Sequence, residues 1–272
     1  WPIAGSVHGI LGWYSDLRFT NYDCQAHTGH GLLHYYGTLS VSNSKFNKNG
    51  YGLYAVAPTE ISLSTSECSD NTSWGLVVSG NPSLTDCTFR NNGHGGLYLS
   101  QASDAKLRVS NVTVADNKYY GVYADSSRVT LDKNSISNWT VTGCPYPWTF
   151  HKSQVDVNGL TLQSDAKAAY AMLTYYCDLN IKASTLVGNG TSTGLYVYQP
   201  TAFRAQELTL TKHGGWATMI YADSSGVAPI TLDRCSIRDN AYAAYINGAK
   251  GNIVTFKDTS LENNLNYGLY FD

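Results

Sequence analysis

Residues 89–98 read Phe89-Arg90-Asn91-Asn92-Gly93-His94-Gly95-Gly96-Leu97-Tyr98, and parts of this stretch return along most of the chain. A tripeptide of glycine, leucine or valine, and tyrosine occurs at 52–54, 96–98, 121–123, 194–196 and 268–270, with Gly75-Leu76-Val77 as a weaker copy. Glycines 52, 75, 96 and 121 are 23, 21 and 25 residues apart, and the intervals of 73 and 74 residues to glycines 194 and 268 fit three repeats each. This period indicates a solenoid, because each repeat can bury its apolar face only against its neighbours.

Three degenerate copies stand where a repeat is due, at Ala168-Ala169-Tyr170, Met219-Ile220-Tyr221 and Ala243-Ala244-Tyr245. Strand alternation turns the leucine or valine of each copy inward and the tyrosine outward. The predicted outward column is Tyr54, Tyr98, Tyr123, Tyr170, Tyr196, Tyr221, Tyr245 and Tyr270. Two interpretations stay open: tyrosines that stabilise the coil by stacking between turns, or a surface for assembly or for stacking on sugars.

A second anchor precedes the glycine, an apolar residue followed three positions later by asparagine. The predicted corner asparagines are Asn49, Asn71, Asn92, Asn117, Asn189, Asn240 and Asn264. Asparagine and glycine accept left-handed backbone angles at low cost, so we expect them to turn the corners. Stacked asparagine side chains can also bond one another between turns, which predicts a structural ladder.

Between these anchors lie short alternating runs such as Leu39-Ser40-Val41 and Val129-Thr130-Leu131, with the period of half-buried strands. No stretch has apolar residues at helical spacing, while strand formers and turn residues dominate. The repeat is too short for a propeller blade and lacks the helix of a leucine-rich repeat. An all-β fold remains, a parallel β-helix.

The Asn-x-x-x-Gly-apolar pattern resembles the repeats of right-handed parallel β-helix proteins of the pectin-lyase-like superfamily. The Phe-x-x-Asn element is also similar to the repeats of bacterial polymorphic outer-membrane proteins and related surface β-helices, whose Gly-Gly-Ala-Ile element is replaced here by Gly-Leu-Tyr. The resemblance covers roughly residues 17–272. It implies a right-handed, single-stranded β-helix of about 11 turns with 21–26 residues each, but no single function, since the superfamily includes lyases, hydrolases, tailspikes, adhesins and structural proteins.

One domain, 1–272, is expected, with an irregular loop excursion around 139–180. In that segment Cys144-Pro145-Tyr146-Pro147-Trp148 breaks the corner pattern, and prolines favour a loop over a regular strand. Spacing alone assigns no pairing to the six cysteines. Cys144 and Cys177 flank the excursion and are the predicted disulfide, whereas Cys68, Cys87 and Cys235 are expected to be small core residues.

The charge balance is near neutral, with 18 basic and 20 acidic side chains scattered singly. No basic patch indicates a nucleic-acid partner, and no run of ~18 apolar residues predicts a transmembrane segment. The sequence starts at Trp1 without methionine, which fits removal of a signal peptide or larger precursor and equally fits a sequence trimmed from a longer one. The expected location is extracellular or at the cell surface.

No catalytic residue, cofactor or metal site is predicted. A polysaccharide lyase needs calcium-binding carboxylates beside a basic residue, and a glycoside hydrolase needs facing carboxylates, but no adjacent-turn group of this kind stands out. Asp70, Asp116 and Asp239 recur in register and are interpreted as turn formers. The segment from Cys24 to His34 concentrates metal-capable side chains, but alternation would send some of them to opposite faces.

The final residues, Asn264 to Asp272, form a complete repeat with no polar cap. Solenoids normally need capping repeats, so the sequence favours either a piece of a longer coil or an open end that stacks on another copy. The first functional hypothesis is an extracellular structural protein that self-assembles, through its ends or its tyrosine face, into a surface layer, sheath or fibre. The alternative is a carbohydrate-active or carbohydrate-binding β-helix with a polysaccharide partner.

Overall fold

The computed structural model describes residues 2–3, 5–102, 105–222, 228–248 and 253–272. The chain divides into two compact units, which are described separately. Unit 1 comprises residues 1–129 and 134–144, and unit 2 comprises residues 130–133 and 145–272.

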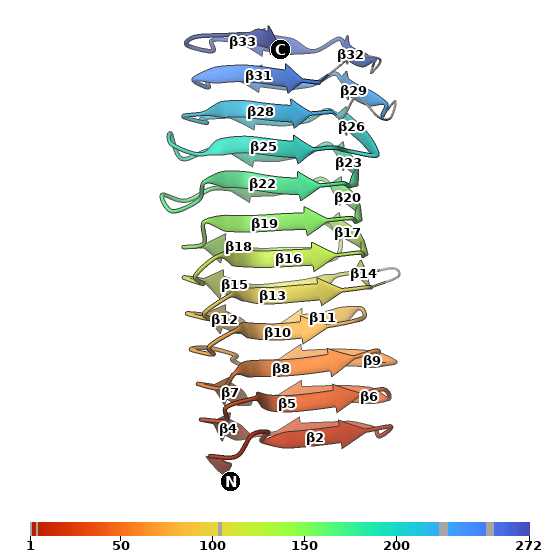
Figure 1. Cartoon of the computed structure of the whole chain (residues 1–272), viewed down its shortest axis with the longest axis vertical. Coiled ribbons are helices and arrows are strands. Elements are labelled where there is room, and N and C mark those ends of the chain that lie inside the picture. The colour runs from red at the N-terminus through yellow and green to blue at the C-terminus, as the bar shows by residue number, and fades with distance from the viewer. Residues whose placement is uncertain (1, 4, 103–104, 223–227, 249–252) are drawn as a thin grey trace. The chain divides into compact units, whose positions relative to one another are not determined.

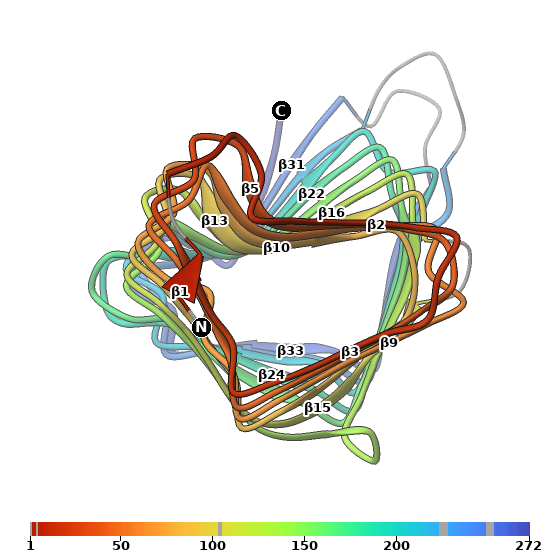
Figure 2. The ribbon, with the colours of Figure 1, turned by 90° about the horizontal axis from the view of Figure 1, so that it is seen from below.

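Unit 1 is a coil in which strands from successive turns lie over one another (Figures 1 and 2). One sheet, here called the tyrosine sheet of unit 1, has the order β2 Ile10–Trp13, β5 His30–Tyr35, β8 Tyr51–Val56, β10 Trp74–Val78, β13 Gly95–Ser100 and β16 Tyr120–Asp125. A second sheet contains β3 Leu17–Thr20, β6 Thr38–Ser42, β9 Glu60–Ser64, β11 Pro82–Thr85, β15 Arg108–Ala115 and β18 Ile136–Thr142. The remaining strands are β1 Pro2–Ile3, β4 Asp23–Gln25, β7 Lys45–Asn47, β12 Thr88–Arg90 and β14 Ala105–Lys106, and β17 Arg128–Asp132 is divided between the units.

Unit 2 repeats the plan with three sheets. Its tyrosine sheet has the order β19 Tyr146–His151, β22 Tyr170–Tyr175, β25 Thr193–Tyr198, β28 Trp216–Tyr221, β31 Tyr242–Asn247 and β34 Leu269–Phe271. The second contains β20 Gln154–Asn158, β23 Asp178–Lys182, β26 Ala202–Gln206, β29 Ile230–Asp233 and β32 Val254–Lys257. The third contains β21 Thr161–Gln163, β24 Thr185–Val187, β27 Thr209–Thr211, β30 Ser236–Arg238 and β33 Ser260–Glu262.

The predicted all-β, parallel β-helix is confirmed. Neighbouring strands pair in parallel, as in Leu53 opposite Leu76 and Leu195 opposite Thr218. The part of the chain that the structure describes contains no helix, and so none that is long and apolar enough to cross a membrane.

The core consists of columns of like side chains stacked turn upon turn. In unit 1 the register places Leu32, Leu53, Leu76, Leu97 and Val122 in one column, and all are 0 % exposed. Burying a side chain of this size contributes roughly 2 kcal/mol. Each side chain packs mainly on the turns above and below it. The apolar residues that recur with the repeat period are therefore the residues that form the core.

The predicted loop excursion over 139–180 is wrong, because the segment is built of regular strands from β18 to β23. Pro145 precedes β19, and Pro147 is its second residue. The register of β19 with β22 begins at Thr149 and continues through His151. Both prolines therefore lie before the residues that pair with β22.

The predicted Cys144–Cys177 disulfide is also absent, because all six cysteines are free and buried thiols. The Cys144 thiol donates to the carbonyl of Thr142 at 3.2 Å, and the Cys177 thiol donates to that of Tyr175 at 3.2 Å. Ser153 and Ser184 make the same contact with the carbonyl two residues before them. These cysteines therefore occupy a corner position for small polar side chains, a role that their spacing did not reveal.

Candidate functional site

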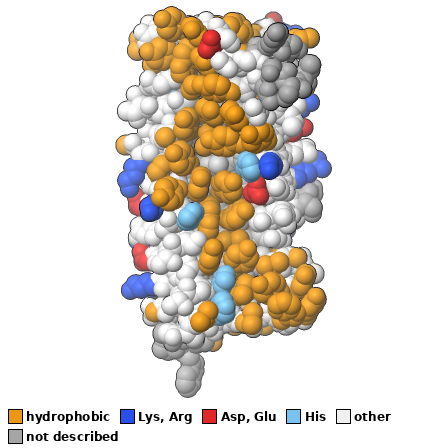
Figure 3. Space-filling model, viewed as in Figure 1, with side chains coloured by type: hydrophobic (Ala, Val, Ile, Leu, Met, Phe, Trp, Pro, Cys, Tyr) orange, Lys and Arg blue, Asp and Glu red, His pale blue; other side chains and the backbone are white. Residues whose placement is uncertain are grey.

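The outer surface of the tyrosine sheet is the most distinctive surface of each unit. In unit 1 the strands β5, β8, β10, β13 and β16 contain a single charged residue, Asp125, and in unit 2 the six strands of this sheet contain none. Figure 3 shows hydrophobic side chains gathered along these strands, with the charged side chains mostly beside them. This composition makes the sheet a nearly uncharged aromatic surface.

In unit 1 the tyrosines Tyr54, Tyr98 and Tyr123 are half-buried, while the residues before them are fully buried. The Tyr98 and Tyr123 rings have centroids 5.3 Å apart, in edge contact. Val77 stands in register between Tyr54 and Tyr98. The aromatic column of unit 1 is therefore interrupted at β10.

Trp74 fills the gap from the neighbouring outward position of β10. It is in register with Gly95 of β13, which is in register with Tyr120 of β16. The indole lies over Gly95, where an added Cβ would stand 2.3 Å from the indole, and stacks on Tyr120 with an interplanar angle of 10°. Because Gly95 has no side chain, the Trp74 indole extends over β13 and contacts Tyr120, two turns away.

In unit 2 the predicted alignment was wrong for two tyrosines. Tyr170 is in register with Thr193 and Tyr221 with Tyr198, so neither shares the backbone register of Tyr196, Tyr245 and Tyr270. The residues in that register are Leu173 and Met219. In these two turns the position of the repeat glycine is occupied by alanine, Ala171 or Ala217. The predicted alignment did not assign these alanines to that position.

The rings nevertheless form one line in unit 2, because the side chains lean toward one another. Successive centroids from Tyr170 through Tyr196, Tyr221 and Tyr245 to Tyr270 are 5.3, 5.4, 5.4 and 5.6 Å apart. Burial, with a smaller contribution from neighbouring phenols, raises the pKa of Tyr196 to about 12. The Tyr196 phenol is therefore a neutral hydrogen-bonding group at physiological pH.

The corner asparagines form a buried ladder inside the coil. The Asn71 backbone N–H and side-chain amide both donate to the Asn92 Oδ1, at 3.1 and 3.0 Å, and Asn92 donates in the same way to Asn117. Each amide also reaches a backbone carbonyl of the preceding turn, as in Asn92 to Cys68. In unit 2, Asn240 and Asn264 repeat the arrangement.

Two expectations about the corner need correction. The left-handed residue is the one before the ladder asparagine, for example Asp70 with φ 55° and Asp116 with φ 54°, whereas the asparagines themselves are not left-handed. Asn189 lies outside the ladder, since its Oδ1 accepts the local N–H groups of Thr191 and Ser192. Where asparagine is missing, histidine takes its place: the N–H groups of His27 and His213 donate to Asn49 and Asn240.

The repeat glycine also has a role other than the predicted one. Gly52 and Gly75 do not adopt left-handed angles. An added Cβ on either would stand 2.9 Å from the amide nitrogen of the next ladder asparagine, Asn71 or Asn92. Glycine leaves this space to the ladder amides in unit 1, whereas Ala171 and Ala217 stand in the register of the repeat glycine Gly194 in unit 2.

An exposed aromatic cluster lies where β2 and β5 end, and sequence reasoning did not identify it. The Trp13 and Tyr35 rings are tilted by 39° with centroids 4.4 Å apart, and Tyr14 stacks on Tyr36 at 4.5 Å with an interplanar angle of 16°. Trp13 is 58 % and Tyr14 70 % exposed. The aromatic doublets 13–14 and 35–36 were the available signal.

Tyr14 and Tyr36 both have left-handed backbones, with φ 49° and 58°. Bulky side chains adopt this conformation at a cost of roughly 1 kcal/mol, and such strain concentrates at functional positions. In later turns Ala57 and Gln101 occupy left-handed corners after β8 and β13. The aromatic residues are therefore not required by the corner geometry.

The metal-capable segment near the N-terminus does not converge. Cys24 donates to the Gly31 carbonyl, His27 belongs to the ladder, His30 stacks on Tyr51 outside, and His34 is buried inside. Among the described residues no group of three or more His, Cys, Asp and Glu side chains could hold a metal ion.

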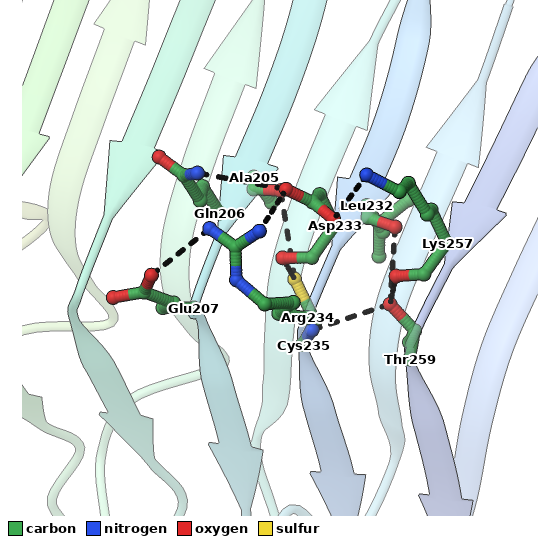
Figure 4. Close-up of polar contacts among 9 residues, drawn as sticks. All are labelled: Ala205, Gln206, Glu207, Leu232, Asp233, Arg234, Cys235, Lys257 and Thr259. Carbon is green, nitrogen blue, oxygen red and sulfur yellow. Dashed lines mark hydrogen bonds and ion pairs between the residues drawn. The ribbon is translucent and has the colours of Figure 1, made fainter.

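Charged side chains of unit 2 gather instead on β26, β29 and β32 and the corners after them (Figure 4). Arg234 contacts both Glu207 and Asp233 at 3.0 Å, and Lys257 lies 3.8 Å from Asp233. Each of these carboxylates is paired with a cation, which is an arrangement typical of surface ion pairs and not of a proton-transferring pair.

The comparison with known proteins concerns the fold. The sequence model of a family described as "Right handed beta helix region" matches residues 5–136 and 84–272. No curated protein and no solved structure gave a significant match. Since the matched residues cover almost the whole chain and the structure is a coil of parallel strands, the protein belongs to the right-handed β-helix family.

Proposed function

We propose that this protein is an extracellular or cell-surface structural protein whose copies associate with one another through the tyrosine sheet. The observation that carries the proposal is the near absence of charge from the strands of this sheet, where tyrosine and tryptophan rings predominate. Aromatic residues with a polar edge are enriched at protein interfaces, whereas charged residues are depleted from interface cores.

A second copy is the partner that fits this surface best. The rings recur once per turn, and successive centroids in unit 2 are 5.3–5.6 Å apart. Only a surface with the same repeat can interdigitate with such a column over many turns, and another tyrosine sheet supplies it. The partner in this proposal is therefore a copy of the chain, and fractionation of the source cells tests the proposed location.

Met219 offers a test that leaves the rings intact. It is a half-buried outward residue between Tyr196 and Tyr245 in the register. We expect Met219→Lys to shift the protein toward monomer in sedimentation velocity, because a charge would be desolvated in the interface. The matched control is Thr231→Lys, a half-buried outward position on β29. A wild-type protein that stays monomeric at high concentration would overturn the proposal.

The exposed cluster of Trp13, Tyr14, Tyr35 and Tyr36 supports a second candidate function, the binding of a neutral glycan. Its open rings could stack on the apolar face of a pyranose. We expect Tyr14→Asn and Tyr36→Asn to abolish retardation in gels that contain a neutral polysaccharide, with folding kept, because asparagine tolerates the left-handed corner. Gln101→Asn, at another left-handed corner, is the control. Equal mobility of the wild type with and without every glycan would exclude this function.

A further inference from the structure

We propose that the line of phenols on unit 2, centred on Tyr196, Tyr221 and Tyr245, is a site of oxidative cross-linking that forms dityrosine within one chain. The rings already stand in contact, with centroids 5.4 Å apart on both sides of Tyr221. They come from three different strands, β25, β28 and β31. A link would therefore join successive turns of the coil covalently.

The reaction requires a one-electron oxidant of the peroxidase–peroxide class. Each of two phenols loses one electron and one proton, and the two radicals form a carbon–carbon bond between the positions next to their hydroxyls. The hydrogen on each bonded carbon then moves to oxygen and restores the aromatic ring. The product lacks two hydrogen atoms, and one hydrogen peroxide is reduced to two waters.

The arrangement favours this reaction in two ways. Holding the reacting groups together replaces a bimolecular encounter by a unimolecular step, which is a large kinetic advantage. The six thiols, which would otherwise react with oxidants first, are all buried. Met219 lies between Tyr196 and Tyr245 in the register and is the competing target, since peroxide converts thioether to sulfoxide without a peroxidase.

Peptide mapping of the full chain after treatment with a haem peroxidase and hydrogen peroxide tests the proposal. Trypsin cleaves after Lys182, Arg204, Lys212 and Arg234, so Tyr196 and Tyr221 fall in separate peptides, 183–204 and 213–234. We expect these two peptides to appear joined, two hydrogen atoms lighter than their sum, with dityrosine fluorescence. The yield per chain should not change on dilution, which distinguishes the link from one between copies and keeps this test independent of self-association.

Tyrosine-to-phenylalanine variants keep each ring and remove only the phenol. Tyr196→Phe and Tyr221→Phe should each abolish the joined pair. Tyr198→Phe is the matched control, because Tyr198 lies in the same peptide as Tyr196 but its ring is 6.3 Å from Tyr221. The proposal is overturned if the pair survives in Tyr196→Phe, if the unfolded chain in urea gives the same yield, or if oxidation stops at Met219.

Discussion

The indole of Trp74 and the phenol ring of Tyr120 lie parallel, 5.8 Å apart between centroids, although one strand stands between them. Gly95 occupies that strand in register with both residues. An aromatic contact that skips a turn therefore depends on a residue without a side chain.

Gly95→Ala tests this dependence. The new methyl group would stand 2.3 Å from the indole, so Trp74 must leave its place and its stack on Tyr120. We expect a loss of about 1–3 kcal/mol in the free energy of unfolding and a red shift of tryptophan fluorescence. Gly80→Ala is the control, because its nearest neighbour would be at 3.4 Å. Equal stability of the two variants would show that the stack contributes nothing.

The asparagine ladder makes a prediction about stability. Asn92→Ala removes the acceptor of two Asn71 donors and the donors to Cys68 and Asn117, all inside the coil. Leaving buried polar groups unpaired should lower the free energy of unfolding by roughly 3 kcal/mol in urea titration. Asn189→Ala should cost less, since Asn189 stands outside the ladder: its Oδ1 accepts local N–H groups and its amide donates to the Asp165 carbonyl alone. A smaller effect at Asn92 than at Asn189 would contradict this role.

His213 makes the coil sensitive to acid. It is 1 % exposed, its Nε2 contacts the Leu186 carbonyl at 3.2 Å, and burial lowers its pKa to about 4. As pH falls below 6.5 the unfolded chain binds the proton first, so the free energy of unfolding falls by up to about 3 kcal/mol by pH 4.

The variant His213→Asn restores the residue of the ladder and removes the titrating group. We expect its stability, measured by urea unfolding, to fall less than that of the wild type between pH 7 and pH 4. Parallel pH profiles for the two proteins would show that His213 does not titrate in this range.

The free cysteines predict insensitivity to redox conditions. Because all six cysteines are buried and none forms a disulfide, a thiol reagent should label none quickly in the folded protein and all six in denaturant, and a reducing agent should leave the melting temperature unchanged. The double variant with Cys144→Ser and Cys177→Ser should fold, since Ser153 and Ser184 make the same corner contact. An unreduced protein with the mass of a disulfide form would contradict the free-thiol state.

Much of the fold could be predicted because the same interactions stabilise every turn of a solenoid. The spacing from Asn92 to Gly96 and the alternation after it predicted the corner and the strand, and both recur in the structure. The alignment failed at Tyr170 and Tyr221, where an alanine occupies the glycine position and the tyrosine moves to another register. The predicted alignment followed the tyrosine of each copy, and it therefore placed Ala168 and Met219 where the structure has Ala171 and Ala217.

The sequence by itself determined the parallel coil, its period, its buried columns and the outward direction of the tyrosines, because these follow from local alternation and from identical neighbours. Only the tertiary structure showed which rings touch, that Trp74 reaches Tyr120 over Gly95, and that His213 replaces an asparagine of the ladder. It also showed that the cysteines remain thiols. These features depend on the directions in which side chains extend between turns, and the spacing of residues along the chain does not specify these directions.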